Sequence, residues 1–271
     1  MSEAIEFVEL GFDDRRLEIE YQWVGAGAHT LVFLHEGLGS RAMWKDFPAQ
    51  LCTALGCRGL VYSRPGYGAS TARAEGETWP VEFMHHQAHD LLPALLERLG
   101  VDEGPFWLFG HSDGASIALL YAARFSAQLR GLMLLAPHIR VEEVSIRSIE
   151  QVRRAYRETE LREKLARYHR NPDSAFYGWN EAWLAPAFRD WSIEAQIGAI
   201  RCPLLAVQGV DDEYGTLDQI HGIARRVEQA ELLVLEDCGH SPQRDQPERL
   251  LAACVDFVAR QGGFDPVEAA G

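Results

Sequence analysis

The sequence predicts an α/β fold, in which helices cover both faces of a mostly parallel β-sheet. Short, continuously apolar runs at residues 31–34, 59–62 and 106–109 are typical of strands that are buried on both faces of such a sheet. Helical patterns at residues 42–55 and 81–99 separate these runs. Because helices connect the successive strands, we expect those strands to lie parallel.

The remaining strands follow from similar patterns at the two ends of the chain. Residues 5–10 and 17–24 precede the buried runs, and the second of these segments alternates as a half-buried strand does. Another apolar run occupies residues 132–135. The later strands are predicted at residues 204–209 and 232–235, and the last helix at residues 247–260.

Between residues 139 and 200 the alternation of strand and helix stops. This stretch, which we call the cap segment, has helical patterns, several aromatic residues and no convincing strand. We therefore expect a helical cap at residues 139–200, inserted in a core formed by residues 1–138 and 201–271.

Composition narrows the possible functions. The 271 residues carry a net charge of −14, which disfavours binding to nucleic acids and to anionic membranes. The first residues lack the basic start and apolar centre of a signal peptide, and no apolar stretch is long enough to cross a bilayer, so we expect a cytoplasmic protein. An odd number of irregularly spaced cysteines favours a reduced compartment, and their spacing predicts no metal site. The cysteines are Cys52, Cys57, Cys202, Cys238 and Cys254.

The pentapeptide Gly110-His111-Ser112-Asp113-Gly114 is the most informative motif. It lies between the apolar run 106–109 and a helical pattern, and G-x-S-x-G in that context is typical of a nucleophile elbow. Such a turn exposes the serine oxygen above the sheet, and the flanking glycines let the strand and the helix pack closely.

Together with other motifs, the elbow resembles the α/β-hydrolase family over nearly the whole chain. Residues 31–40 are similar to that family's oxyanion loop, and residues 62–70 contain a similar R-x-G-x-G-x-S segment. A Gly-His pair follows the last predicted strand, at residues 239–240. The resemblance implies an α/β-hydrolase fold with a mostly parallel sheet, flanking helices and an inserted helical cap.

A nucleophile, an acid and a base follow one another along the chain in the order Ser, Asp, His. Ser112 is the expected nucleophile and His240 its base, because imidazole accepts and returns a proton near neutral pH. Asp212 and Asp211 compete for the third position, and Glu213 is a weaker candidate. In the family the acid usually stands three residues after a strand-closing glycine, which favours Asp212.

An oxyanion hole requires two backbone N–H donors near the nucleophile. The first is expected from Asp113, the residue after the nucleophile. The resemblance implies a second donor in the loop after His35, which we assign to Gly37. The family commonly has glycine directly after this histidine, but Glu36 stands there. Because of that departure, the sequence assigns the second donor only to within one residue of Gly37. The departure also places an additional carboxylate close to the site.

Asp113 has two explanations. An acid in the first turn of a helix is favoured by the helix dipole. Alternatively, the Ser-Asp-Gly triplet resembles the elbow of valacyclovir-hydrolase-like enzymes, in which the acid pairs with the amino group of the substrate.

The remaining candidates for substrate contact come from the edge of the cap segment and from its aromatic residues, which are typical of apolar pocket walls. The expected substrate-binding residues are Glu36, His138, Trp179, Trp183 and Trp191.

These features predict a serine hydrolase that cleaves a small or medium carboxylic ester without a cofactor or a metal, with a preference for amine-bearing substrates if Asp113 binds a cation. Two alternatives share the fold. One is a carbon–carbon bond hydrolase that acts on aromatic ring-cleavage products, and the other is a ligand receptor with little turnover. The expected partner is a small-molecule substrate, and the protein is expected to be a monomer or a homodimer.

Overall fold

The computed structural model describes residues 4–12 and 15–263. Its eight strands form one sheet in the order β1-β2-β4-β3-β5-β6-β7-β8. β1 and β2 pair antiparallel, as do β2 and β4, whereas all later pairs are parallel. The strands are β1 (Glu6–Phe12), β2 (Arg15–Gly25), β3 (Thr30–Leu34), β4 (Arg58–Tyr62), β5 (Phe106–His111), β6 (Leu129–Leu135), β7 (Leu204–Gly209) and β8 (Ala230–Leu235).

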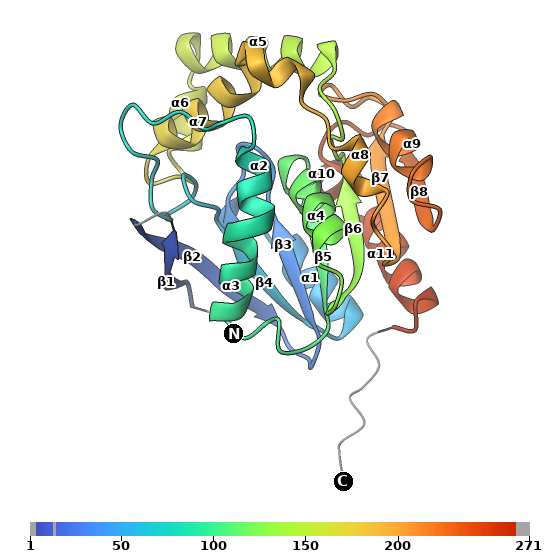
Figure 1. Ribbon diagram of the computed structural model, residues 1–271. Coiled ribbons are helices and arrows are strands. Elements are labelled where there is room, and N and C mark those ends of the chain that lie inside the picture. The colour runs from blue at the N-terminus through green and yellow to red at the C-terminus, as the bar shows by residue number, and fades with distance from the viewer. Residues whose placement is uncertain (1–3, 13–14, 264–271) are drawn as a thin grey trace.

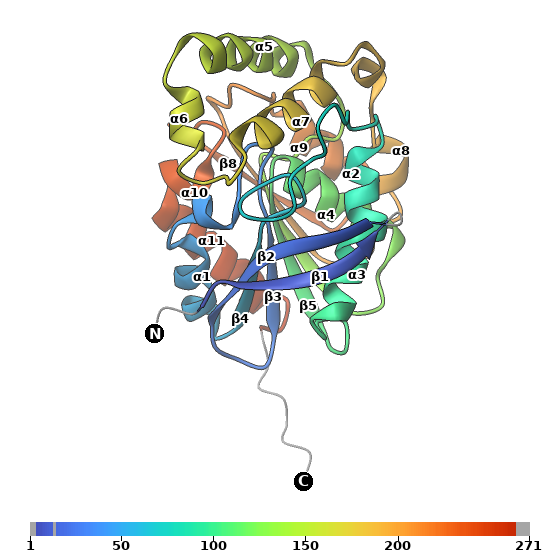
Figure 2. The ribbon, with the colours of Figure 1, turned by 90° about the vertical axis from the view of Figure 1, so that its left-hand side faces the viewer.

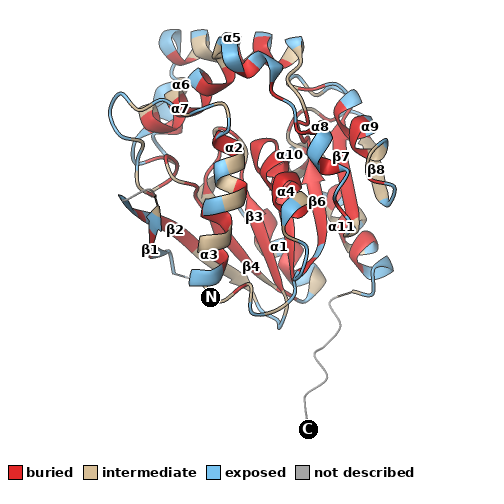
Figure 3. Ribbon diagram, in the orientation of Figure 1, coloured by how far each residue is buried: buried red, intermediate tan, exposed pale blue. Residues whose placement is uncertain are grey.

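Helices cover both faces of the sheet. α1 (Phe47–Leu55) and α11 (Pro247–Arg260) pack on one face, against Leu31 and Phe33 of β3. Val32 and Leu34, the alternate residues of β3, face the opposite cluster, which includes α3 (Leu92–Arg98) and α4 (Asp113–Arg124). Figure 1 shows the central strands enclosed between these helices, and Figure 3 shows that the strands are buried almost throughout.

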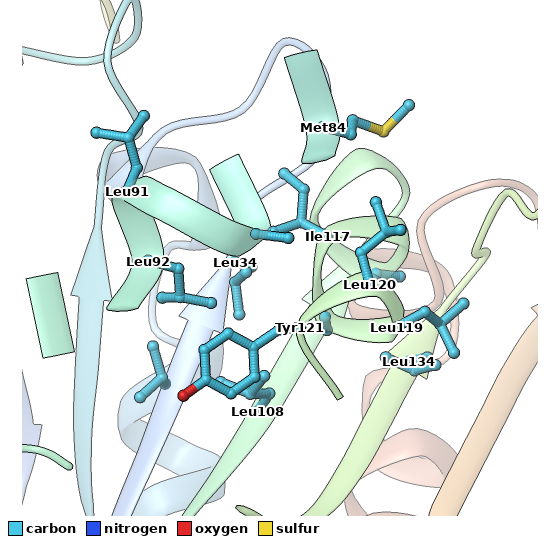
Figure 4. Close-up of a cluster of buried hydrophobic side chains, with 14 of the residues drawn as sticks. Leu34, Met84, Leu91, Leu92, Leu108, Ile117, Leu119, Leu120, Tyr121 and Leu134 are labelled. Atoms are coloured by element: carbon cyan, nitrogen blue, oxygen red, sulfur yellow. The ribbon is translucent and has the colours of Figure 1, made fainter. Parts of the chain in front are cut away.

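The core beneath α4 holds the start of that helix firmly. Leu34, Leu108 and Leu134 come from three adjacent strands, β3, β5 and β6, and lie beside Ile117 and Tyr121 of α4 (Figure 4). Leu34, Leu108 and Leu134 are fully buried. Because α4 packs on three strands at once, its first residues have a fixed position relative to the carboxyl ends of those strands.

Between β6 and β7 the described elements are helices, apart from an isolated antiparallel bridge between Arg140 and Ser192. Most of these helices lie beyond the carboxyl ends of the parallel strands (Figure 1). The elements are α5 (Glu143–Glu158), α6 (Leu161–Leu165), α7 (Pro172–Leu184), η3 (Pro186–Asp190) and α8 (Glu194–Ile197). Figure 2 shows α5, α6 and α7 together in the upper part of the molecule, above β1 and β2. A short α9 (Asp218–Ala224) and α10 (Pro242–Asp245) follow β7 and β8.

Two predicted helices differ from the structure. The expected helix at residues 42–55 is divided into η1 (Arg41–Trp44) and α1, because the backbone of Lys45 has a φ of 54° and ends the first turn. The expected helix at residues 81–99 begins later, with α2 (Phe83–His86), and widens into a π-helical turn, η2 (Gln87–Leu91), before α3. The wide turn lies just before Pro93, which has no N–H to donate to a regular helix.

The described residues contain no helix that combines the length and the apolar character needed to cross a bilayer.

Candidate active site

Ser112 occupies the sharp turn between β5 and α4. Its backbone φ of 53° is unusual for a residue with a side chain. The two neighbouring glycines are required by close packing. A Cβ at Gly110 would lie 2.5 Å from the Gly114 carbonyl oxygen, and one at Gly114 would lie 2.1 Å from the Leu34 carbonyl oxygen. The turn therefore combines local strain with tight packing, which is the geometry that an elbow requires.

His240 lies between Ser112 and Asp212. Its Nε2 is 2.9 Å from Ser112 Oγ, and its Nδ1 is 2.8 Å from Asp212 Oδ1. A carboxylate accepts hydrogen bonds, so Nδ1 carries the proton toward Asp212, and Nε2 is left to accept the serine hydroxyl. These three side chains come from the loops after β5, β7 and β8 and meet at one edge of the sheet.

Asp212, rather than Asp211 or Glu213, faces the imidazole. Its Oδ1 also accepts the backbone N–H of Tyr214 at 2.8 Å, and its Oδ2 accepts the Gln208 amide at 3.1 Å. Asp211 is exposed. Glu213 accepts the backbone N–H of His240 at 3.1 Å and so holds its main chain rather than its ring. Of the three candidate acids, Asp212 is the one whose carboxylate contacts the His240 ring.

The two ionisable partners shift each other's pKa. Burial lowers the pKa of His240, but the charge and the hydrogen bond of Asp212 outweigh it, so that the pKa is raised overall. Burial raises the pKa of Asp212, but the charge and the hydrogen bond of His240 reverse that effect, so its pKa is lowered. The pair therefore favours an ionised Asp212 and a more basic His240.

Gly37 and Asp113, the two residues assigned to the oxyanion hole, come from different segments of the chain. Asp113 is the first residue of α4, and Gly37 lies in the loop after β3. A Cβ on Gly37 would come within 2.1 Å of Trp179 Nε1, so a larger residue would displace this indole from the loop. Both residues line the pocket over Ser112.

The carboxylate of Asp113 already has partners. Trp183 Nε1 donates to its Oδ1 at 3.0 Å, and Arg64 Nη2 lies 3.8 Å from its Oδ2. Burial raises the pKa of Asp113. Arg64 and the Trp183 N–H oppose this effect only in part, so that the pKa stays above its ordinary value. The side chain of Asp113 is only 1% exposed, and its two oxygens face Arg64 and Trp183.

A pocket of about 190 Å³ opens above Ser112. This is smaller than the roughly 300–1,000 Å³ usual for drug-sized ligands and suits a small substrate. Four of the five expected substrate-binding residues line it, and these are Glu36, His138, Trp179 and Trp183. The ring of His138 lies 5.0 Å from that of Trp183, and burial, together with nearby His240, lowers the pKa of His138 to about 3.

Trp191, the fifth expected substrate-binding residue, does not line this pocket. Its ring stacks on Phe188 at 5.3 Å and an angle of 14°, and it lies 6.3 Å from the ring of Trp183. Trp191 therefore belongs to the apolar core of the cap segment, behind the pocket wall. The sequence shows an aromatic cluster there but not which of its members face the site.

The sequence matches a model of the alpha/beta hydrolase family over residues 31–253. That match covers most of the chain and includes every residue of the site. The chain belongs to the alpha/beta hydrolase family.

Relatives of this alpha/beta hydrolase have several activities. It is 25% identical to the serine hydrolase BPHL of Mus musculus, over 72% of this chain and 67% of that protein. It is 22% identical to a 2-hydroxy-6-oxo-6-phenylhexa-2,4-dienoate hydrolase of Comamonas testosteroni, over 90% of this chain and 92% of that protein. It is 26% identical to a proline iminopeptidase of Thermoplasma volcanium, over 83% of this chain and 88% of that protein.

Solved structures of other family members have the same fold. A thermophilic esterase from Thermogutta terrifontis superposes with a TM-score of 0.70 at 23% identity, covering 94% of this chain and 99% of that one. A hydrolase from Pseudomonas aeruginosa PA01 superposes with a TM-score of 0.72 at 20% identity, covering 93% of this chain and 98% of that one. At these identities the likeness establishes the fold.

Several lining residues of this alpha/beta hydrolase were not anticipated from its sequence. The ring of Tyr214 lies 4.7 Å from that of His240, and Ser145 and Ile149 of α5 also face the pocket. Tyr214 stands two residues after Asp212, so a search of the segment around the acid could have found it. Ser145 and Ile149 are four residues apart on one helical face, a pattern equally typical of core packing.

Proposed function

We propose that this alpha/beta hydrolase is a serine esterase that cleaves a small carboxylic ester through an acyl-enzyme on Ser112. The observation that carries the proposal is the continuous contact from Ser112 Oγ through His240 to Asp212, at 2.9 and 2.8 Å, on a strained strand-to-helix turn. A serine, a base and an orienting acid in this arrangement suit acyl transfer.

In the proposed reaction, Ser112 Oγ attacks the ester carbonyl while His240 Nε2 takes its proton. The backbone N–H groups of Asp113 and Gly37 stabilise the oxyanion. His240 then protonates the departing alkoxide, and a water molecule, activated by His240, releases the acid from Ser112. Asp212 keeps the imidazole in the required tautomer and stabilises its cation.

Pre-steady-state hydrolysis of p-nitrophenyl acetate tests this proposal. An acyl-enzyme predicts a rapid release of about one p-nitrophenol per active site when deacylation is slower than acylation, followed by steady turnover. A receptor of the same fold would release at most that first equivalent. Absence of any release, from a protein that is folded, would contradict the esterase proposal.

The second candidate is a hydrolase of aromatic ring-cleavage products. It is favoured by the similarity to the Comamonas testosteroni 2-hydroxy-6-oxo-6-phenylhexa-2,4-dienoate hydrolase, which extends over 90% of this chain. The same serine, histidine and acid would serve a carbon–carbon cleavage. A comparison of kcat/KM for 2-hydroxy-6-oxo-6-phenylhexa-2,4-dienoate and for aryl acetates separates the two, and the esterase proposal requires the ester to be the better substrate.

The pH dependence of kcat/KM follows from the raised pKa of His240. The imidazole must be neutral to accept the serine proton, so activity is lost as the pH falls through that pKa. We therefore expect kcat/KM to rise with pH, with a midpoint above the ordinary histidine value of 6.5. Initial rates at substrate concentrations far below KM, measured across this range, provide the check. A midpoint below the ordinary value would contradict the assigned role of Asp212.

Glu36 is proposed to contact an amine on the substrate, in place of Asp113. Its side chain is 23% exposed, whereas that of Asp113 is 1% exposed and faces Arg64 and Trp183. Burial raises the pKa of Glu36, but the His111 ring, 3.5 Å away, more than reverses the effect, and the pKa falls to about 2. An ionised carboxylate in the pocket wall favours a cationic substrate group.

An α-aminoacyl aryl ester and its N-acetylated twin test the role of Glu36. We expect kcat/KM to favour the free amine by roughly tenfold or more, since a hydrogen bond to a charged group contributes about 1.5–3 kcal/mol. The Glu36→Gln variant should lose most of this preference, because it removes the charge and keeps the shape. Asp113→Asn is the matched control and should retain the preference ratio. A ratio that vanishes in Asp113→Asn and survives in Glu36→Gln would assign the amine to Asp113 instead.

A further inference from the structure

Arg64 is a fully buried arginine next to the proposed active site. It follows β4 by two residues, is 0% exposed, and its guanidinium lies 4.7 Å from the centre of the Tyr67 ring. Its Nε and Nη1 have no hydrogen-bond partner among the described residues. A buried charge with unsatisfied donors is costly, and an apolar residue would often be more stable in its place. Stability alone therefore does not account for Arg64.

The main chain and the side chain of Arg64 both contact the loop that precedes Gly37. Its backbone N–H donates to His35 Nε2 at 3.0 Å. Its Nη2 donates to the Glu36 carbonyl oxygen at 3.0 Å and to the His35 carbonyl oxygen at 3.3 Å. Arg64 thus contacts both peptide units before Gly37. The Glu36 carbonyl oxygen also accepts the Gly39 N–H at 3.0 Å and lies 2.7 Å from His35 Nδ1.

The same nitrogen, Nη2, also lies 3.8 Å from Asp113 Oδ2. The other carboxylate oxygen of Asp113, Oδ1, accepts a hydrogen bond from Trp183 Nε1 at 3.0 Å. One guanidinium therefore connects the loop after β3 with the first residue of α4. These two segments carry the two N–H groups assigned to the oxyanion. Arg64 itself does not line the pocket in the described part of the chain.

We infer that Arg64 is a positioning residue that holds the backbone N–H groups of Gly37 and Asp113 at the separation needed to bind the oxyanion. The inference rests on the proposed esterase function. Donors that are already oriented stabilise developing charge without having to reorganise. Removal of one such donor commonly lowers kcat by about 10²–10³-fold, and a displacement of about 1 Å can have a comparable effect.

Two variants test this inference. Arg64→Lys keeps a positive charge near Asp113, but a compact ammonium does not reproduce the planar arrangement of guanidinium donors. The double variant Arg64→Met with Asp113→Asn removes both charges, so that no buried carboxylate is left unpaired. Arg41→Met is the matched control, because Arg41 contacts Glu20 at 3.1 Å and Ser63 in the neighbouring network, and is not paired with Asp113.

The readouts are kcat/KM for an aryl acetate and the inhibition constant of an aryl trifluoromethyl ketone, which forms a tetrahedral oxyanion adduct with a catalytic serine. Each measurement uses the concentration of active sites, which is determined by labelling the protein to completion with a fluorophosphonate. In both Arg64 variants we expect kcat/KM to fall about 10- to 100-fold, with adduct affinity falling in parallel and KM changing less than about threefold. Arg41→Met should stay within about twofold of wild type.

Unchanged kcat/KM in both Arg64 variants would overturn the inference. A loss of kcat/KM without a parallel loss of adduct affinity would also overturn it, since that result indicates a structural role alone. Ester hydrolysis that persists in Ser112→Ala would instead contradict the proposed function, so the two failures are distinguishable.

Discussion

The Ser112→Ala variant is expected to hydrolyse aryl esters with a kcat about 10⁴- to 10⁶-fold below that of the wild-type enzyme. The hydroxyl lies 2.9 Å from His240 Nε2 and is the atom assigned to attack the carbonyl. Without it no acyl-enzyme forms, and only the oxyanion donors and substrate binding remain to assist direct attack by water. Steady-state rates, measured with enough enzyme to detect the residual activity, give this ratio.

Ser116→Ala is a suitable control for the nucleophile variant. Ser116 lies one turn further along α4, is also buried, and donates its hydroxyl to the His138 carbonyl oxygen at 2.6 Å. Its loss should disturb the helix without removing the nucleophile, and we expect less than a tenfold change in kcat. If Ser112→Ala kept more than about a tenth of wild-type kcat, another group would have to be the nucleophile.

The Asp212→Asn variant is expected to lower kcat about 10⁴-fold. An amide in this position can present N–H groups to His240 Nδ1, which then becomes the acceptor and leaves the proton on Nε2. In that tautomer the imidazole cannot take the proton of Ser112. The measurement is kcat for an aryl acetate, with the unfolding temperature as a check that the variant is folded.

Asp211→Asn is the matched control for this substitution. Asp211 is the preceding residue and is exposed, so the same change of chemistry there should leave kcat within about twofold of wild type. Because Asp212 raises the pKa of His240, the Asp212→Asn variant should also shift the acidic midpoint of kcat/KM to lower pH. Equal losses in the two variants, or a loss confined to Asp211→Asn, would contradict the assignment of the acid.

The parts of the site that could be predicted from sequence depend on short-range geometry. The elbow needs only a strand, a serine between glycines and a helix, and these are consecutive in the chain. His240 and Asp212 follow buried strands whose carboxyl ends must meet at one edge of a parallel sheet. The order of motifs therefore indicates the segments of the acid and the base, whereas the choice of Asp212 over Asp211 also needed the spacing of the acid from the strand-closing glycine that the family resemblance implies.

The contacts that were missed are between side chains far apart in the sequence. Asp113 was considered as a free carboxylate, but Arg64 and Trp183, which come from different segments, face it. The aromatic pattern of the cap segment likewise does not separate Trp183, in the pocket wall, from Trp191, which stacks on Phe188 behind it. Such contacts depend on how the cap helices pack, and no local pattern records that packing.

Peptide mass mapping tests directly whether Ser112 carries the acyl group. The enzyme is mixed with an aryl ester of a slowly deacylating acid, quenched in acid, digested and analysed by tandem mass spectrometry. We expect a mass increase equal to the acyl group on the peptide containing Ser112, localised to that residue and absent from Ser112→Ala. An acyl group on another residue, or turnover of the ester with no acylated peptide under conditions that slow deacylation, would contradict it.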